Sequence, residues 1–255
     1  MSTKRYYIMK WIALISMLID HIASAFRETF NWDANLYTFC RTIGRFAFPL
    51  FCFMLVESFY FTDNKARHLV KIAILAIVSE IPFDLAIRGK IIDISYQNVC
   101  VTLVLGFTML WVMQYWTPCV YNYAKSDVVV KLFAVPVFNI IMLFIFGFAA
   151  SALGTDYGFS GIFLIWGFNL AISAKNTYLR YAVVIIIFIF MRMDIMYVAC
   201  LVDLAIIYVL THESNLDKTK LAELVIGKKS RAIGSVFYPM HLTVIAVIRT
   251  IVTLL

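Results

Sequence analysis

The segment IMKWIALISMLIDHIASAF, residues 8–26, is apolar over nearly its whole length. About 20 such residues are enough for a helix to cross the hydrocarbon core of a bilayer. Asp20 and His21 interrupt the segment close to its end. Ionisable side chains at membrane depth are costly unless they face a polar cavity or a partner, and they commonly mark functional sites. The segment therefore predicts a transmembrane helix that carries two candidate functional residues.

The rest of the chain shares this apolar character. Of its 255 residues, 63% are hydrophobic and 15% are charged, and the mean hydropathy is +0.87. Soluble domains carry about 25% charged residues. The sequence therefore predicts an all-α, polytopic membrane protein that forms a single transmembrane domain over residues 1–255. We expect about nine transmembrane helices, in the segments 8–26, 40–61, 68–87, 96–116, 128–150, 158–174, 178–192, 195–211 and 233–254.

The positions of Lys and Arg predict how these segments are oriented. Cytoplasmic loops of membrane proteins carry an excess of both residues. A cytoplasmic N-terminus and an outer C-terminus, and therefore an odd number of spans, place most of the 22 Lys and Arg residues on the cytoplasmic side. We expect the first segment to be retained, because Asp20 and His21 stand where a cleaved signal would be apolar or small. This topology explains the net charge of +7, so nucleic acid is not an expected partner.

The cysteines give no sign of a metal centre. The chain has no Cys-x-x-Cys and no His-x-x-x-His pattern, which are typical spacings of zinc ligands. We therefore expect no metal. The five cysteines are most simply packing or lipid-facing residues: Cys40, Cys52, Cys100, Cys119 and Cys200.

Two further pairs of ionisable residues fall inside predicted spans. Arg41 and Arg45 lie one helical turn apart, and so do Glu80 and Asp84. Two arginines can therefore meet two carboxylates across neighbouring helices and form a polar cavity, which would also accommodate the two ionisable residues of the first segment. Structural ion pairs, Arg45 with Glu80 or Arg41 with Asp84, would give the same pattern in the sequence.

Neighbouring residues on a helix point in different directions. Asp20 and His21 are about 100° apart around the helix axis, so Asp20 cannot orient the ring of its own neighbour. Either one of the two faces the cavity and the other a flanking helix, or the helix ends nearby. Three weaker candidates lie elsewhere: Asn98 at the start of the fourth span, and Tyr238 and His241 near the inner end of the last span.

Several stretches along the chain together resemble the TraX family, whose namesake acetylates the N-terminus of F-pilin. They occur in the right order and cover the chain nearly end to end. The stretches are KWIALISMLIDHI (10–22), IGRFAFPLFCFMLVESF (43–59), SEIPFDLA (79–86), YQNVCVTL (96–103), DYGFSGI (156–162) and FYPMHL (237–242).

This family is similar in turn to the acyltransferase-3 and heparan-glucosaminide acetyltransferase group. Those proteins move acetyl groups from cytoplasmic acetyl-CoA to acceptors on the far side of the membrane. Their first helix carries a basic residue and, eleven residues later, a histidine, which Lys10 and His21 match. The group usually has Arg-Gly at the first position, where this chain has Lys-Trp. Its later basic motif has a loose counterpart in Arg67, His68 and Lys71.

The resemblance implies an integral-membrane O- or N-acetyltransferase in a bacterial plasma membrane. His21 would be the general base, because imidazole titrates near neutral pH. Asp20 would assist it or anchor the helix, and Arg45 would stabilise the developing oxyanion. The residues expected to bind the acceptor are Arg41, Glu80, Asp84, Asn98, Tyr238 and His241. The residues expected to hold acetyl-CoA, the donor substrate, are Lys10, Arg67 and Lys71.

Two other functions remain compatible with the sequence. Buried Asp, Glu and His residues also form proton relays, so a small proton-coupled transporter or channel that uses the buried Asp, His, Arg and Glu network is the main alternative. A non-catalytic assembly protein, with ion pairs that only hold its helices together, is the other. The sequence does not identify the acceptor, does not separate direct transfer from an acetyl-histidine intermediate, and leaves a homo-oligomer open.

Overall fold

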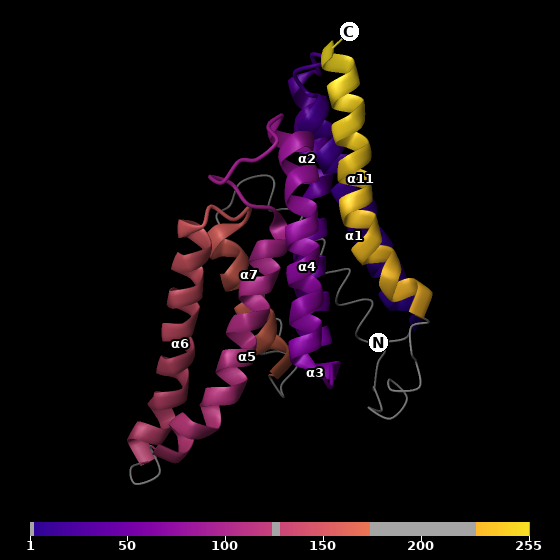
Figure 1. Ribbon diagram of the computed structural model, residues 1–255. Coiled ribbons are helices and arrows are strands. Elements are labelled where there is room, and N and C mark those ends of the chain that lie inside the picture. The colour runs from indigo at the N-terminus through magenta and orange to yellow at the C-terminus, as the bar shows by residue number, and fades with distance from the viewer. Residues whose placement is uncertain (1–2, 124–127, 174–227, 255) are drawn as a thin grey trace. The chain divides into compact units, whose positions relative to one another are not determined.

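The computed structural model describes residues 3–123, 128–173 and 228–254, and over these residues every regular element is a helix (Figure 1). An isolated bridge between Gln97 and Thr155 accompanies them. The predicted all-α class is thus confirmed. The helices are α1 (Thr3–Phe26), α2 (Ala34–Gly44), α3 (Ala47–Phe61), α4 (Lys65–Phe83), the π-helix η1 (Asp84–Arg88), α5 (Val99–Tyr123), α6 (Val128–Ala152), α7 (Gly158–Ser173) and α11 (Lys228–Leu254).

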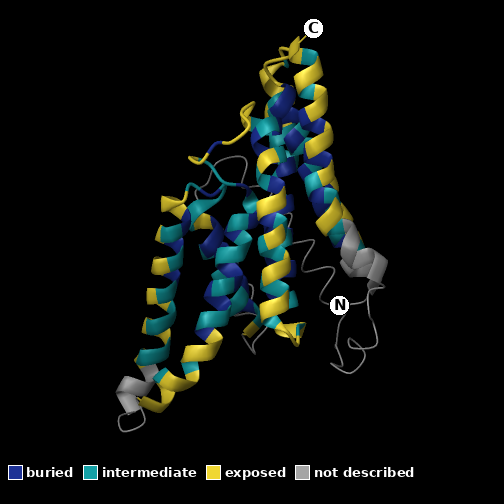
Figure 2. Cartoon of the chain, viewed as in Figure 1, coloured by how far each residue is buried: buried dark blue, intermediate teal, exposed yellow. Residues whose placement is uncertain are grey.

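Within the described residues, five stretches are long and apolar enough to cross a membrane. They are Tyr7–Phe26, Ala34–Phe61, Val99–Tyr123, Phe133–Ala152 and Gly234–Leu254. The exposed faces of α4, α6 and α11 (Figure 2) carry large apolar side chains such as Ile77, Phe144 and Val247. Apolar side chains in this number on helix exteriors are typical of surfaces that meet lipid. By length and composition, these helices agree with the predicted polytopic helical membrane protein.

The predicted number of nine spans is not confirmed. The expected segment 68–87 forms α4 and η1, and the expected segment 158–174 forms α7, which has only 16 residues. Neither belongs to the five stretches above. The expected segments 178–192 and 195–211 lie outside the described residues.

The chain divides into two compact units, and two of the boundaries between them fall inside α3 and α4. The first unit comprises residues 1–51, 78–93 and 188–255, and the second comprises residues 52–77 and 94–187. In the first unit, α1 packs against α2 and α11, and η1 packs against α1 and α11. In the second unit, α5, α6 and α7 pack against one another.

The helices α1 and α11 run in the same direction. Lys10 lies against Gly234, and eleven residues further along α1 His21 meets His241 of α11. Two parallel spans place the start of one helix and the end of the other on opposite sides of the membrane. This agrees with the odd number of spans that the Lys and Arg distribution predicts, while the cytoplasmic side of the N-terminus stays a prediction.

The second unit is held by aromatic packing and by a pinned loop. Phe59 meets Phe107 edge to face at 5.2 Å, and Phe53 meets Phe168 in the same way at 5.7 Å. Such contacts add specific geometry to the burial of large apolar surfaces. The backbone N–H of Gln97 donates to the carbonyl of Gly154 at 3.0 Å, so the segments before α5 and after α6 are joined.

Candidate functional site

A pair of buried histidines joins α1 to α11. Nδ1 of His21 lies 2.7 Å from Nε2 of His241, and both residues are less than 9% exposed. The rings are nearly coplanar, with an interplanar angle of 4° and centroids 5.0 Å apart. A nitrogen–nitrogen distance of 2.7 Å at this centroid separation means that the rings meet end to end, in a hydrogen bond, and not face to face.

The hydrogen-bond partners fix which nitrogen carries each proton. Nδ1 of His241 lies 2.8 Å from the carbonyl oxygen of Phe237, which can only accept, so this nitrogen must be protonated. In a neutral His241 the other nitrogen, Nε2, then accepts, and Nδ1 of His21 must donate to it. The remaining nitrogen of a neutral His21, Nε2, therefore carries a lone pair. Within the described residues, Nε2 of His21 makes no hydrogen bond.

Aromatic side chains of α11 enclose this pair. The ring of Phe237 stacks on His241 with centroids 5.0 Å apart. Tyr238 is buried, and its ring approaches His21 edge-on at 6.3 Å and His241 at 5.7 Å. The enclosure limits the movement of both imidazoles and excludes bulk water from them, which strengthens their hydrogen bonds.

The acidic neighbour of His21 has a different partner. Asp20 Oδ2 accepts a hydrogen bond from Arg41 Nη1 of α2 at 2.6 Å, in a partly buried ion pair. His21 thus faces α11 while Asp20 faces α2, which is the division expected for adjacent residues on one helix. Asp20 does not orient the His21 ring; the carbonyl of Phe237 does so, through His241.

Gly44 allows the close approach of α1 and α2 at this ion pair. A Cβ atom on Gly44 would lie 2.2 Å from Asp20 Oδ1 and 2.3 Å from Asp20 Cβ. Real Cβ contacts are never this short, so any side chain at this position must displace α1 or the Asp20–Arg41 pair. Gly44 did not stand out in the sequence, where it is a single glycine between Ile43 and Arg45.

We expect Gly44→Ala to destabilise the protein by about 1 to 3 kcal/mol, the usual cost of forcing extra volume into a packed contact. Thermal unfolding of the purified protein in detergent measures this. Gly234→Ala is the matched control, because its Cβ would meet only the flexible end of Lys10, with Cε at 2.8 Å. Equal unfolding temperatures for Gly44→Ala and the wild type would contradict the assignment.

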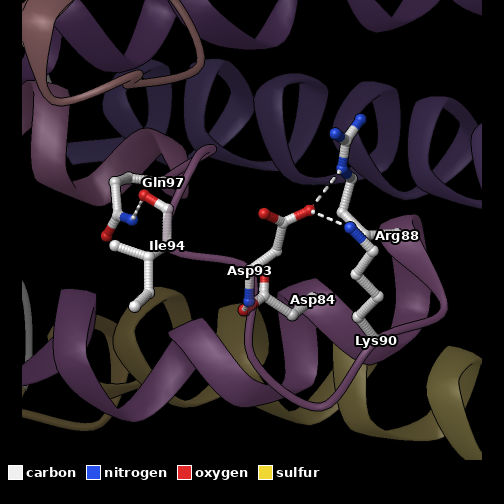
Figure 3. A network of polar contacts seen from close by, with 6 residues as sticks. All are labelled: Asp84, Arg88, Lys90, Asp93, Ile94 and Gln97. Carbon is white, nitrogen blue, oxygen red and sulfur yellow. Dashed lines mark hydrogen bonds and ion pairs between the residues drawn. The ribbon is translucent and has the colours of Figure 1, made fainter.

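Asp84 holds a turn and does not pair with Arg41. It opens η1, is 1% exposed, and its Oδ2 accepts the backbone N–H of Asp93 at 2.7 Å (Figure 3). Pro82 near the end of α4 has no N–H to donate and disturbs the regular helix just before η1 begins. Since Arg41 bonds to Asp20, the Arg41–Asp84 ion pair that the sequence allowed does not form.

Charged side chains at the two ends of the turn after η1 hold it in place. Asp93 Oδ2 accepts from Lys90 Nζ at 3.1 Å and from Arg88 Nε at 3.4 Å (Figure 3). Arg249 of α11 donates to the carbonyl of Ala86 at 2.8 Å. Gly89 supplies the left-handed backbone, with φ of +68°, that ends η1. This region therefore acts as a structural connection between η1 and α11.

Arg45 and Glu80 also belong to the first unit, and both are half-buried. Arg45 caps the end of α2, where its backbone N–H bonds to the carbonyls of Arg41 and Thr42. Arg45 follows Arg41 by four residues in the sequence. Its oxyanion role stays a prediction. Lys10 lies eleven residues before His21 on α1, about 16 Å away and within about 20° of the same helix face.

Three predicted site residues belong to the second unit. Asn98 is fully buried, and its amide group is used inside the fold, donating to the carbonyl of Ala76 at 2.8 Å and accepting the N–H of Cys100 at 2.8 Å. Asn98 therefore has a structural role at the start of α5. Arg67 and Lys71 are exposed and lie one turn apart on α4, and their role toward acetyl-CoA stays a prediction.

The sequence placed His241 near the inner end of the last span and gave no sign of its contact with His21. The structure places it beside His21, halfway along α11. The carbonyl of Phe237 was also missed as the group that fixes the proton positions. The four-residue spacing between Phe237 and His241 was the available signal, because a side chain can reach the carbonyl one turn earlier. Among the described residues, no cluster of His, Cys, Asp and Glu is suited to a metal ion.

Comparison with known proteins agrees with the motifs. The family model described as TraX protein matches residues 6–249. The probable fimbrial assembly protein FimC, serogroup H1, of Dichelobacter nodosus is 30% identical over 111 residues, which is 41% of this chain and 44% of that protein. The matched region thus spans less than half of that relative, and no solved structure matches. Because the family model covers nearly the whole chain, the protein belongs to the TraX family.

Proposed function

We propose that this protein is a membrane acetyltransferase that uses His21 as its general base. The observation that carries the proposal is the hydrogen-bonded series from His21 to His241 to the carbonyl of Phe237. It leaves Nε2 of His21 with a lone pair in a buried position inside an apolar span. A base must present such a lone pair to the proton that it removes.

The proposed reaction needs one proton transfer in each direction. The hydroxyl or neutral amine of the acceptor attacks the carbonyl carbon of the acetyl thioester, and Nε2 of His21 takes its proton. The negative charge that develops on the carbonyl oxygen would be stabilised by an arginine, for which Arg45 is the candidate. The carbon–sulfur bond then breaks, and the imidazolium of His21 returns the proton to the departing CoA thiolate. Free CoA and the acetylated acceptor are the products.

Acetyl-CoA would enter from the cytoplasmic side, where the start of α1 is predicted to lie. Lys10 is the candidate in the first unit for contact with its phosphates. The distance of about 16 Å along the helix from Lys10 to His21 suits a coenzyme whose pantetheine arm extends inward from a surface-bound headgroup. The printed name of the Dichelobacter nodosus relative makes a component of fimbrial assembly one candidate acceptor.

The alternative of a proton relay is less well supported by the same geometry. A relay must pass each proton on to a further titratable group or to water. The series from His21 ends at the carbonyl of Phe237, which accepts a hydrogen bond and cannot pass a proton on. The arrangement suits the orientation of a base better than conduction.

Donor binding separates these functions. We expect acetyl-CoA to raise the unfolding temperature of the purified protein in detergent, because a ligand that binds only the folded state stabilises it by mass action. At a concentration of about 100 times Kd this amounts to about 2.7 kcal/mol. Slow CoA release should accompany binding. Propionate and free pantetheine serve as controls. If millimolar acetyl-CoA does not shift the unfolding temperature and the protein carries protons across liposome membranes, the transporter is supported instead.

A further inference from the structure

Three cationic side chains gather around Gly89, at the turn that follows η1. Arg88 and Lys90 flank Gly89 in the sequence, and both bond to the same oxygen, Asp93 Oδ2 (Figure 3). The guanidinium group of Arg249 lies against Gly89 itself, since a Cβ atom there would come within 3.2 Å of Arg249 Nη2. The turn therefore carries more positive charge than the ion pairs of the described residues neutralise.

Arg249 has most of its hydrogen-bonding capacity left over. Its Nη1 donates to the carbonyl of Ala86 at 2.8 Å, and within the described residues it forms no ion pair. A guanidinium group carries five N–H donors, so this carbonyl takes up one of them and leaves the charge unpaired. Arg249 is half-buried in an apolar span, where an uncompensated charge is costly. An anion bound at this place would remove that cost.

The predicted topology gives this gathering of cations a place at the outer edge of the bilayer. Lys and Arg are scarce on the outer side of membrane proteins. The ones that this topology leaves outside the cytoplasmic loops are Arg27, Arg41, Arg45, Arg88, Lys90, Arg192 and Arg249. Three of them meet at Gly89. Arg249 stands five residues before Leu254, the last residue of its span, which is where lipid headgroups are expected.

The residues that follow Lys90 add an apolar element to this surface. Ile91 and Ile92 are 69% and 65% exposed. Large aliphatic side chains beside basic ones are typical of segments at a bilayer interface, where the aliphatic groups enter the acyl region and the charges meet anionic headgroups. A free anion in water would match the cations and leave the two isoleucines without a partner. An anionic group that carries hydrocarbon chains matches both.

We propose that Arg249 and Lys90 bind the phosphate of a membrane phospholipid, with Ile91 and Ile92 against its acyl chains. Guanidinium matches phosphate with two parallel N–H···O bonds, and an ammonium group adds a point charge. The Lys90 side chain is 63% exposed and can reach a headgroup beside Asp93. Because η1 packs against α1 and α11, the bound lipid would also stabilise this end of the first unit. The proposal does not depend on acetyltransferase activity.

Titration of the purified protein in detergent with lipids, followed by its unfolding temperature, tests this. We expect dioleoyl phosphatidylglycerol to raise the unfolding temperature. Dioleoylglycerol, which lacks the phosphate, and inorganic phosphate, which lacks the chains, should not. Arg249→Gln should weaken the apparent affinity for the phospholipid by about tenfold or more, the loss expected from one charge-assisted hydrogen bond. Glutamine can still donate to the carbonyl of Ala86, so the end of η1 keeps its cap.

Lys90→Gln is the second variant, and it alters an exposed side chain in case Arg249→Gln fails to fold. Arg27→Gln is the matched control, because Arg27 is an exposed cation of the same unit and the same predicted side, over the ring of Tyr37 at 4.2 Å. Lys90→Gln should also weaken phospholipid binding, and Arg27→Gln should bind as the wild type does.

The other outcomes would overturn the proposal. Absence of any stabilisation of the wild type by the phospholipid excludes the site, and so do equal affinities of the wild type, Arg249→Gln and Lys90→Gln. An equal loss in Arg27→Gln would show that only the overall charge matters. Equal stabilisation by dioleoylglycerol would show that the phosphate is not recognised, and equal stabilisation by inorganic phosphate would show a site for a soluble anion in place of a lipid.

Discussion

Replacement of His21 is expected to lower the rate of acetyl transfer by a factor of about 100 to 10,000, the range associated with loss of a positioned general base. His21→Ala removes the imidazole nitrogen whose lone pair accepts no hydrogen bond within the described residues, and also leaves a cavity beside Tyr238. His21→Phe removes the base and keeps a ring of similar size. Both variants should still be stabilised by acetyl-CoA, because the proposed arrangement places the donor's phosphates at Lys10, about 16 Å from this residue.

The measurement is the release of CoA, followed with a thiol reagent, and the transfer of labelled acetyl groups to a membrane extract. Ser16→Ala is the matched control, since Ser16 is a buried polar residue on the same helix, 4% exposed, outside the histidine pair. It should release CoA at the rate of the wild type. A His21→Phe protein that folds, binds acetyl-CoA and transfers acetyl groups at full rate would show that His21 is not the base.

The features that the sequence predicted correctly are local ones. The length and apolarity of residues 8–26 were enough to predict α1, because the bilayer sets the required length. The separation of Asp20 from His21 followed from the rotation of about 100° per residue, and the structure shows them facing α2 and α11. The TraX family was also evident from motifs distributed along the chain, and the family model confirms it.

The features that the sequence could not predict depend on which helices are neighbours. His21 and His241 are 220 residues apart, and one sequence gives no measure of their proximity. The sequence allowed Arg41 to pair with any of three carboxylates, those of Asp20, Glu80 and Asp84. It pairs with Asp20 because α2 packs closely on α1 at Gly44. The turn of η1 directs Asp84 to the N–H of Asp93, and η1 packs against α1 and α11, which are distant from it in the sequence.

The role of His241 gives the second large effect. We expect His241→Phe to lower the rate of CoA release by about tenfold to a hundredfold, because Nδ1–H of His21 loses its acceptor in a buried place, at a cost of about 1 to 3 kcal/mol. Phenylalanine keeps a ring against Phe237 and Tyr238, so the packing of α11 is largely preserved. His241→Gln should retain most of the activity, since its side-chain oxygen can accept the same hydrogen bond near the position of Nε2.

The contrast between these two variants distinguishes an orienting role from a structural one. If His241 only fills space, the ring of His241→Phe will preserve the rate and the shorter contacts of His241→Gln will not. If His241 orients the base, His241→Gln will keep the rate and His241→Phe will not. The loss in His241→Phe should then appear in kcat. The KM for acetyl-CoA should stay constant, because the donor does not touch His241 in the proposed arrangement. A double variant, His21→Phe with His241→Phe, should then be no slower than His21→Phe alone, since an orienting residue contributes nothing once the group that it orients is gone.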